Sequence, residues 1–95
     1  MDVEQAYRLK RSAQLKEWGA QLDLLEAKAE NAGADIKVRH AVELDELRGK
    51  QRTAVWKMQE LERSSGEAWE EIKHTADRIW EDLKAGMADA HAKFK

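Results

Sequence analysis

Apolar side chains recur at alternating steps of three and four residues through most of this 95-residue chain, which contains no proline. The first run consists of Leu15, Trp18, Leu22, Leu25, Ala29, Ala32 and Ile36. This spacing gathers the side chains on one stripe of an α-helix, as an amphipathic helix requires. The chain is therefore predicted to be all-α.

The pattern resumes after His40 with Leu44, Leu47, Ala54, Met58 and Leu61. Two successive four-residue steps through His40 form a stutter, which locally unwinds a heptad pattern without ending the helix. The stripe keeps its phase across Gly33, and a glycine inside a helix costs only about 1 kcal/mol. We therefore expect one long helix over about residues 3–63.

A turn at the segment "ENAGADIK" is the alternative. Asn31 and Gly33 could end one helix there, and Asp35 could cap the next. The chain would then close on itself as a monomeric three-helix bundle with segments of nearly equal length.

A second break is predicted at "ERSSGEAW". Ser64 and Glu67 have the spacing of a capping box, in which each side chain satisfies a backbone N–H at a helix start, and Gly66 adds backbone freedom. A turn over residues 64–66 therefore precedes a shorter helix, predicted over about residues 66–94.

Apolar residues of the predicted last helix repeat every eleven positions. Trp69 is followed at this interval by Trp80, and the whole set is Ala68, Trp69, Ile72, Ala76, Ile79, Trp80, Leu83, Met87, Ala90 and Phe94. Eleven residues over three turns correspond to about 3.67 residues per turn, so this stripe stays nearly straight.

The two unequal helices predict a single domain over residues 1–95, an antiparallel coiled-coil hairpin with packing like that of a three-helix bundle. The shorter helix covers only half of the longer one, so we expect a homodimer that buries the remaining stripe. Trp18, Leu47 and Trp80 are expected in one layer of that bundle. The predicted core and interface residues are Trp18, Leu22, Leu25, Ile36, Leu44, Leu47, Met58, Leu61, Trp69, Ile72, Ile79, Trp80, Leu83 and Met87.

The charge balance argues against a dedicated nucleic-acid binder, because 17 Lys and Arg face 19 Asp and Glu. The basic stretch "RGKQRTAVWK" around Trp56 is interrupted by acidic neighbours. We expect Trp56 at the edge of a wide apolar face, its ring covered by the stems of Arg52 or Lys57.

The absence of cysteine excludes disulfides and thiolate sites. No apolar run has membrane-spanning length and "MDVEQAYRLKR" does not read as a signal peptide, so a cytoplasmic location is expected.

No motif predicts a catalytic, cofactor or metal site. Glu71 and His74 form one E-x-x-H motif, whereas di-iron bundles need two such motifs and further glutamates. His40 is interpreted as a buried neutral histidine with one hydrogen-bond partner, with a pH-responsive interface site as the alternative. The protein is expected not to be an enzyme.

At "LKEWGAQLDLLEAKAE" and "SSGEAWEEIKHTADRIWEDLKAG" the sequence resembles a family of small, mostly uncharacterised bacterial coiled-coil proteins, some of them stress-associated. The resembling residues are Trp18, Leu22 and Asp23, the "LEAKA" of 25–29, the "AWEEI" of 68–72 and the "WEDL" of 80–83. The family has no glycine where Gly33 stands, so the resemblance implies the long helix. The eleven-residue repeat is more loosely similar to apolipoprotein-type amphipathic helices.

These observations predict a non-enzymatic structural or interaction protein, a self-associating antiparallel coiled coil, with an unidentified protein partner left open. The alternative is reversible binding to a lipid or membrane surface, since an eleven-residue repeat with Trp and Lys suits an interfacial helix. Residues 67–95 carry seven acidic side chains against five Lys or Arg, which disfavours the membrane surface.

Overall fold

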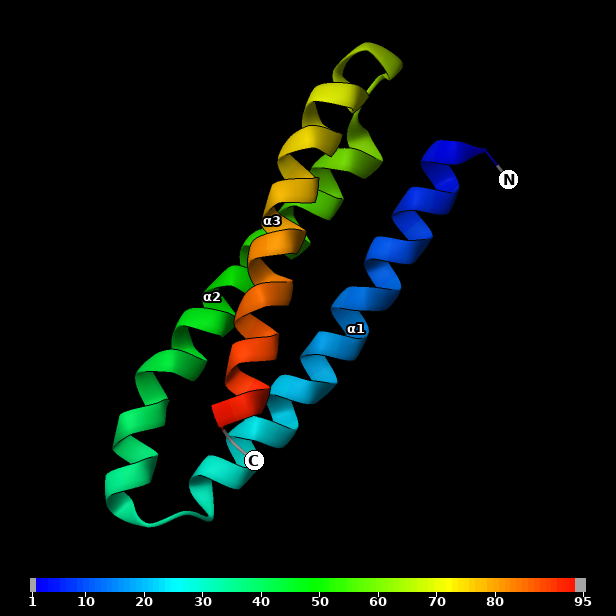
Figure 1. Cartoon of the computed structure of the whole chain (residues 1–95). Helices are drawn as coiled ribbons and strands as arrows, with labels where there is room; N and C mark the ends of the chain where they lie inside the picture. The colour runs from blue at the N-terminus through cyan, green and yellow to red at the C-terminus, as the bar shows by residue number, and fades with distance from the viewer. Residues whose placement is uncertain (1, 94–95) are drawn as a thin grey trace.

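The computed structural model describes residues 2–93, which form three helices: α1 (Val3–Glu30), α2 (Ala34–Arg63) and α3 (Gly66–Lys93). α2 runs back alongside α1, and α3 runs back alongside α2 (Figure 1). Together they make a rod that measures 51 × 21 × 18 Å. The predicted all-α class and the bundle-like packing of helices are confirmed.

The predicted continuous helix over residues 3–63 is wrong, because the chain turns between α1 and α2. The backbone N–H of Asn31 and its side-chain amide both donate to the Ala27 carbonyl, at 3.2 and 3.0 Å, and so satisfy a carbonyl at the end of α1. Gly33 is extended, with φ −59° and ψ 156°, and its carbonyl accepts the N–H of Lys37. Asp35 lies in the first turn of α2 and is not its N-cap, which is Gly33.

Ile36 lies outside the core, contrary to its prediction, and is 45% exposed. Within the described residues α3 reaches only the level of Glu43, where Lys93 Nζ lies 3.1 Å from Glu43 Oε1. The buried stripe of α2 accordingly begins at Leu44. Ile36 therefore has the right phase for the core, but no described residue of α3 lies beside it.

The second turn falls where it was predicted, but Ser64 has a different role. The Ser64 hydroxyl donates to the Leu61 carbonyl at 2.8 Å, so this side chain closes α2 and does not cap α3. The first turn of α3 is formed by the N–H of Trp69, which donates to the carbonyl of Ser65 at 3.0 Å. Phe94, the last residue of the predicted repeat, lies outside the described residues.

The core runs along the whole rod. Its most completely buried large side chains are Trp80, Leu22, Leu61 and Leu83. The remaining buried residues are Leu15, Trp18, Leu25, Ala29, Leu44, Leu47, Ala54, Met58, Trp69, Ala76, Met87 and Ala90. Ile72 and Ile79 are half-buried and pack against this core. The burial of these apolar side chains is the main favourable term in the stability of the bundle.

Leu47 and Trp80 do not share a layer of the core, contrary to the predicted register. Leu47 lies beside Gly86, where its Cδ2 would be only 2.7 Å from a Cβ added to that glycine. The Trp80 ring instead lies beside Arg11, with its centroid 5.7 Å from the guanidinium carbon. Gly86 is six residues after Trp80, or about 9 Å along the helix axis. The predicted single layer of Trp18, Leu47 and Trp80 is therefore wrong.

Candidate protein-interaction surface

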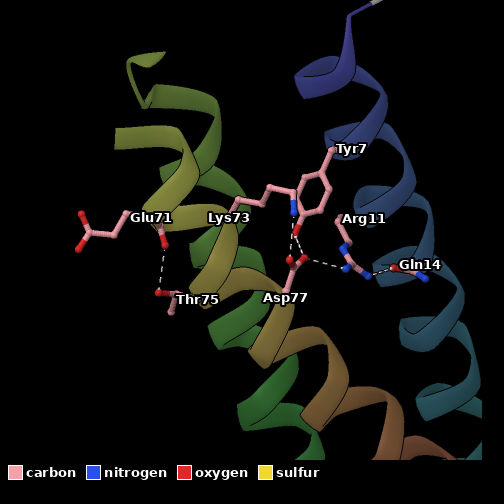
Figure 2. Close-up of polar contacts among 7 residues, drawn as sticks. All are labelled: Tyr7, Arg11, Gln14, Glu71, Lys73, Thr75 and Asp77. Carbon is pink, nitrogen blue, oxygen red and sulfur yellow. Dashed lines mark hydrogen bonds and ion pairs between the residues drawn. The ribbon is translucent and has the colours of Figure 1, made fainter. Parts of the chain in front are cut away.

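A polar cluster joins the beginning of α1 to α3 (Figure 2). The Tyr7 hydroxyl donates to Asp77 Oδ1 at 2.6 Å, and Nη2 of Arg11 lies 3.0 Å from the same oxygen. Lys73 Nζ contacts the other oxygen of Asp77 at 3.1 Å. Arg11 also donates to the side chain of Gln14 at 2.9 Å. The Asp77 carboxylate thus accepts three donors from two helices.

Aromatic contacts support the same cluster. The rings of Tyr7 and Trp69 meet edge to face, with centroids 5.7 Å apart and an interplanar angle of 77°. The guanidinium carbon of Arg11 lies 5.1 Å from the Tyr7 ring centroid, and Lys73 Nζ lies 5.2 Å from it. Both cations therefore stack on a ring that is itself anchored in the core.

The cluster changes the ionisation of its acidic members. Burial disfavours the Asp77 carboxylate, but hydrogen bonds from Tyr7, Lys73 and Arg11 outweigh it and hold the pKa of Asp77 below its ordinary value. Burial, followed by the hydrogen bond to Asp77, raises the pKa of the Tyr7 phenol. The Asp77 carboxylate is held by donors from both helices, which suits the fastening of α1 to α3, although Nε of Arg11 is buried without a hydrogen-bond partner among the described residues.

Ion pairs also border the contacts that α2 makes with its neighbours. Arg48 of α2 pairs with Glu26 of α1 at 2.6 Å and with Asp23. Lys50 of α2 lies 3.3 Å from Asp82 of α3. These exposed or half-exposed pairs contribute little stability but favour one alignment of the helices.

The side of α2 that faces away from the core carries large apolar side chains. Val38, Val42 and Trp56 are 73%, 64% and 76% exposed. Gly49 stands between them, two helical turns from both Val42 and Trp56. We call this surface the α2 outer face; it consists of Asp35, Val38, Val42, Asp45, Glu46, Gly49, Arg52, Trp56 and Arg63.

Trp56 is therefore not covered by the stems of Arg52 or Lys57, contrary to prediction. Ala54 and Met58, two positions before and after it, are both buried. A step of two residues turns a helix by about 200°, so Trp56 points away from the core. This signal was present in the sequence, since Ala54 and Met58 were both assigned to the buried stripe.

Charged side chains of the α2 outer face have no ionic partner within residues 2–93 of the bundle. Among the described residues, no ion pair involves Asp35, Asp45, Glu46, Arg52 or Arg63. Their charges thus contrast with the paired charges of Arg48 and Lys50 on the flanks of the same helix.

The remaining sequence candidates give no chemical site. Glu71 and His74 are exposed, and within residues 2–93 no group of three or more His, Asp or Glu is placed to hold a metal ion. His40 is half-buried, not fully buried as predicted, and its Nδ1 lies 3.6 Å from Glu43 Oε2. A groove of about 700 Å³ between α1 and α2 is lined by apolar and charged side chains that include Leu15 and Met58.

Comparison with family models, with curated proteins and with solved structures finds no match to this chain. The resemblance to small bacterial coiled-coil proteins therefore stays a prediction. Over the described residues, none of the three helices combines the length and apolar character that crossing a membrane requires.

Proposed function

We propose that this chain is a non-enzymatic interaction protein that self-associates through the α2 outer face. The observation that carries the proposal is the exposure of Val38, Val42 and Trp56 along one face of a helix whose opposite face is already buried in the core. Large exposed apolar side chains among charged ones on one helix face suit a protein-binding surface.

Trp56 is the residue that such a surface would use as its anchor. A tryptophan 76% exposed leaves most of a large apolar ring in water. Aromatic side chains are enriched at the centres of protein interfaces, and a few of them supply most of the binding free energy. Full burial of a large apolar side chain contributes about 1.5 to 3 kcal/mol.

The proposed association joins folded bundles and does not exchange segments between chains. The homodimer expected from the sequence relied on a long helix whose N-terminal half stays uncovered, and it would have packed that half on the other chain's hairpin. In the closed bundle Leu15, Trp18 and Leu22 are already buried within the chain. Val3, Leu9 and Leu24 of α1 are also exposed, but the surface that this proposal assigns to a partner is the outside of α2, which carries the exposed tryptophan.

Binding to a lipid surface is less well supported. The repeat that suggested it contains Trp69 and Trp80, which are 3% and 1% exposed. The α2 outer face carries acidic as well as basic side chains, whereas interfacial helices concentrate Lys and Arg on their polar face.

Light scattering over a concentration series tests the proposal. At micromolar concentration the wild type should show about twice the chain mass of 10.9 kDa. Trp56→Glu places a charge on the α2 outer face and should give the mass of a single chain. Ala85→Glu adds the same charge at an exposed position of α3 and should leave the dimer intact. A wild-type chain that stays monomeric at hundreds of micromolar would contradict self-association.

A further inference from the structure

Part of the α2 outer face is symmetric about Gly49. Val42 and Trp56 each lie seven residues from this glycine, on its two sides. Seven residues are close to two helical turns, so all three positions share one face. When two copies of α2 run antiparallel and cross at Gly49, Trp56 of each copy meets Val42 of the other.

Four of the five unpaired charges follow the same symmetry. Glu46 and Arg52 each lie three residues from Gly49, and Asp35 and Arg63 each lie fourteen residues from it. In the antiparallel arrangement Glu46 and Asp35 therefore face Arg52 and Arg63 of the second copy, whereas Asp45 faces Thr53. In a parallel arrangement Glu46 would face Glu46 and Arg52 would face Arg52, so like charges would meet.

Gly49 suits the position where the two helices would be closest. It has no side chain to hold the helix backbones apart, and among the described side chains only that of Arg52 lies within 4 Å of where its Cβ would be, at 3.8 Å. Nothing in the bundle requires a glycine there, since its φ is not positive and no core residue crowds it. Gly86 differs, because Leu47 packs directly against it.

We propose that the occupant of the α2 outer face is a second copy of this chain, with the two α2 helices antiparallel about a twofold axis at Gly49. This inference rests on the proposed function and adds the partner's orientation and register. The interface is isologous, because each copy contributes the same surface and each contact occurs twice. Charge complementarity favours the antiparallel register over the parallel one.

Cysteine cross-linking tests the orientation directly, because the chain contains no cysteine. Gly49→Cys places two thiols at the proposed axis. A disulfide needs the two Cα atoms to be roughly 4.4 to 6.8 Å apart, and the proposed crossing brings the two Cα atoms of residue 49 to that separation. Val38→Cys is the matched control on the same face. Its two thiols would lie eleven residues from the axis on opposite sides, about 33 Å apart along the helices. Under mild oxidation Gly49→Cys should form a covalent dimer and Val38→Cys should not.

A charge exchange tests the register without replacing Gly49. Glu46→Arg alone and Arg52→Glu alone each create two like-charge pairs and should raise the dimer Kd by on the order of tenfold. The double variant restores both pairs and should recover the wild-type Kd. Circular dichroism of each variant establishes that the bundle is still folded.

The outcomes separate this inference from the proposed function. If Val38→Cys cross-links as readily as Gly49→Cys, or if the double charge variant is weaker than either single variant, the antiparallel register is overturned while self-association stands. The register is also overturned if light scattering shows a dimer and neither cysteine variant cross-links. If light scattering shows only monomers and neither cross-links, self-association itself fails.

Discussion

The Tyr7 hydroxyl donates a 2.6 Å hydrogen bond to Oδ1 of Asp77, which lies 70 positions further along the chain. This bond joins the first turns of α1 to the middle of α3 and is reinforced by Arg11 and Lys73 (Figure 2). It fixes the open end of α1, which no turn connects to α3.

Tyr7→Phe should lower the free energy of unfolding by about 1 to 2 kcal/mol, because a hydrogen bond to a charged group is lost. The phenyl ring keeps its edge-to-face contact with Trp69. Thr75→Ala is the matched control, since the Thr75 hydroxyl makes only a long, exposed bond of 3.4 Å to the Glu71 carbonyl. Urea unfolding measures both variants. Equal stabilities for Tyr7→Phe and Thr75→Ala would show that the cluster does not fasten α1.

The Asp77 cluster should make stability depend on pH in the acid range. Despite its partial burial, Asp77 has a lowered pKa in the folded state because of hydrogen bonds from Tyr7, Lys73 and Arg11. Its stabilisation is therefore complete above the unfolded pKa of about 3.9 and is lost as the pH falls through the folded value. The difference in unfolding free energy between wild type and Asp77→Asn should shrink as the pH is lowered below about 4. A difference that stays constant over that range would refute the linkage.

The four tryptophans should fall into two classes of stability effect. Trp80→Ala removes a side chain that is 1% exposed and should cost about 3 to 5 kcal/mol. Trp56→Ala removes one that is 76% exposed and should change the stability of the isolated chain by less than about 0.5 kcal/mol. The comparison must be made at a concentration where the chain is monomeric, because association stabilises the folded state. A large loss in Trp56→Ala under these conditions would place its ring inside the bundle.

A proline at residue 34 distinguishes the turn from a continuous helix. Ala34 is the first residue of α2, where proline is favoured, and Gly33 before it has the extended backbone that a following proline requires. Ala34→Pro should therefore be neutral or stabilise the chain by up to about 1 kcal/mol. Ala27→Pro lies inside α1 and should cost about 3 kcal/mol or more. Thermal unfolding compares the two variants. A similarly large loss of stability in both would indicate a continuous helix through residue 34 and would contradict the turn.

The periodic apolar residues were sufficient to predict the helical class, the last helix and most of the core. Leu22 and Trp80 lie where a 3.6-residue period places them. The first turn was not resolved, because the apolar phase continues from Ala29 to Ile36 although the helix does not. What closes α1 is a side-chain hydrogen bond of Asn31, a local interaction that leaves no trace in the periodicity.

Contacts between distant polar residues could not be predicted. Tyr7 meets Asp77 only because two turns of particular length set the alignment of α1 with α3. A small error in helix register is enough to lose such contacts, as the misplaced layer of Leu47 and Trp80 shows. The exposure of Trp56, in contrast, follows from its neighbours Ala54 and Met58, whose burial forces it outward.

The most direct test of the account is ¹⁹F NMR of the protein labelled with 5-fluorotryptophan, with the Trp56 resonance assigned by its absence in Trp56→Phe. In dilute solution the Trp56 resonance should be the only one with a large H₂O/D₂O isotope shift, because Trp18, Trp69 and Trp80 are buried. As the concentration rises, that shift should fall for Trp56 while the other three resonances stay unchanged. A Trp56 ring that remains solvent-exposed at every concentration would contradict self-association through the α2 outer face. A second tryptophan ring that is exposed in dilute solution would contradict the described core.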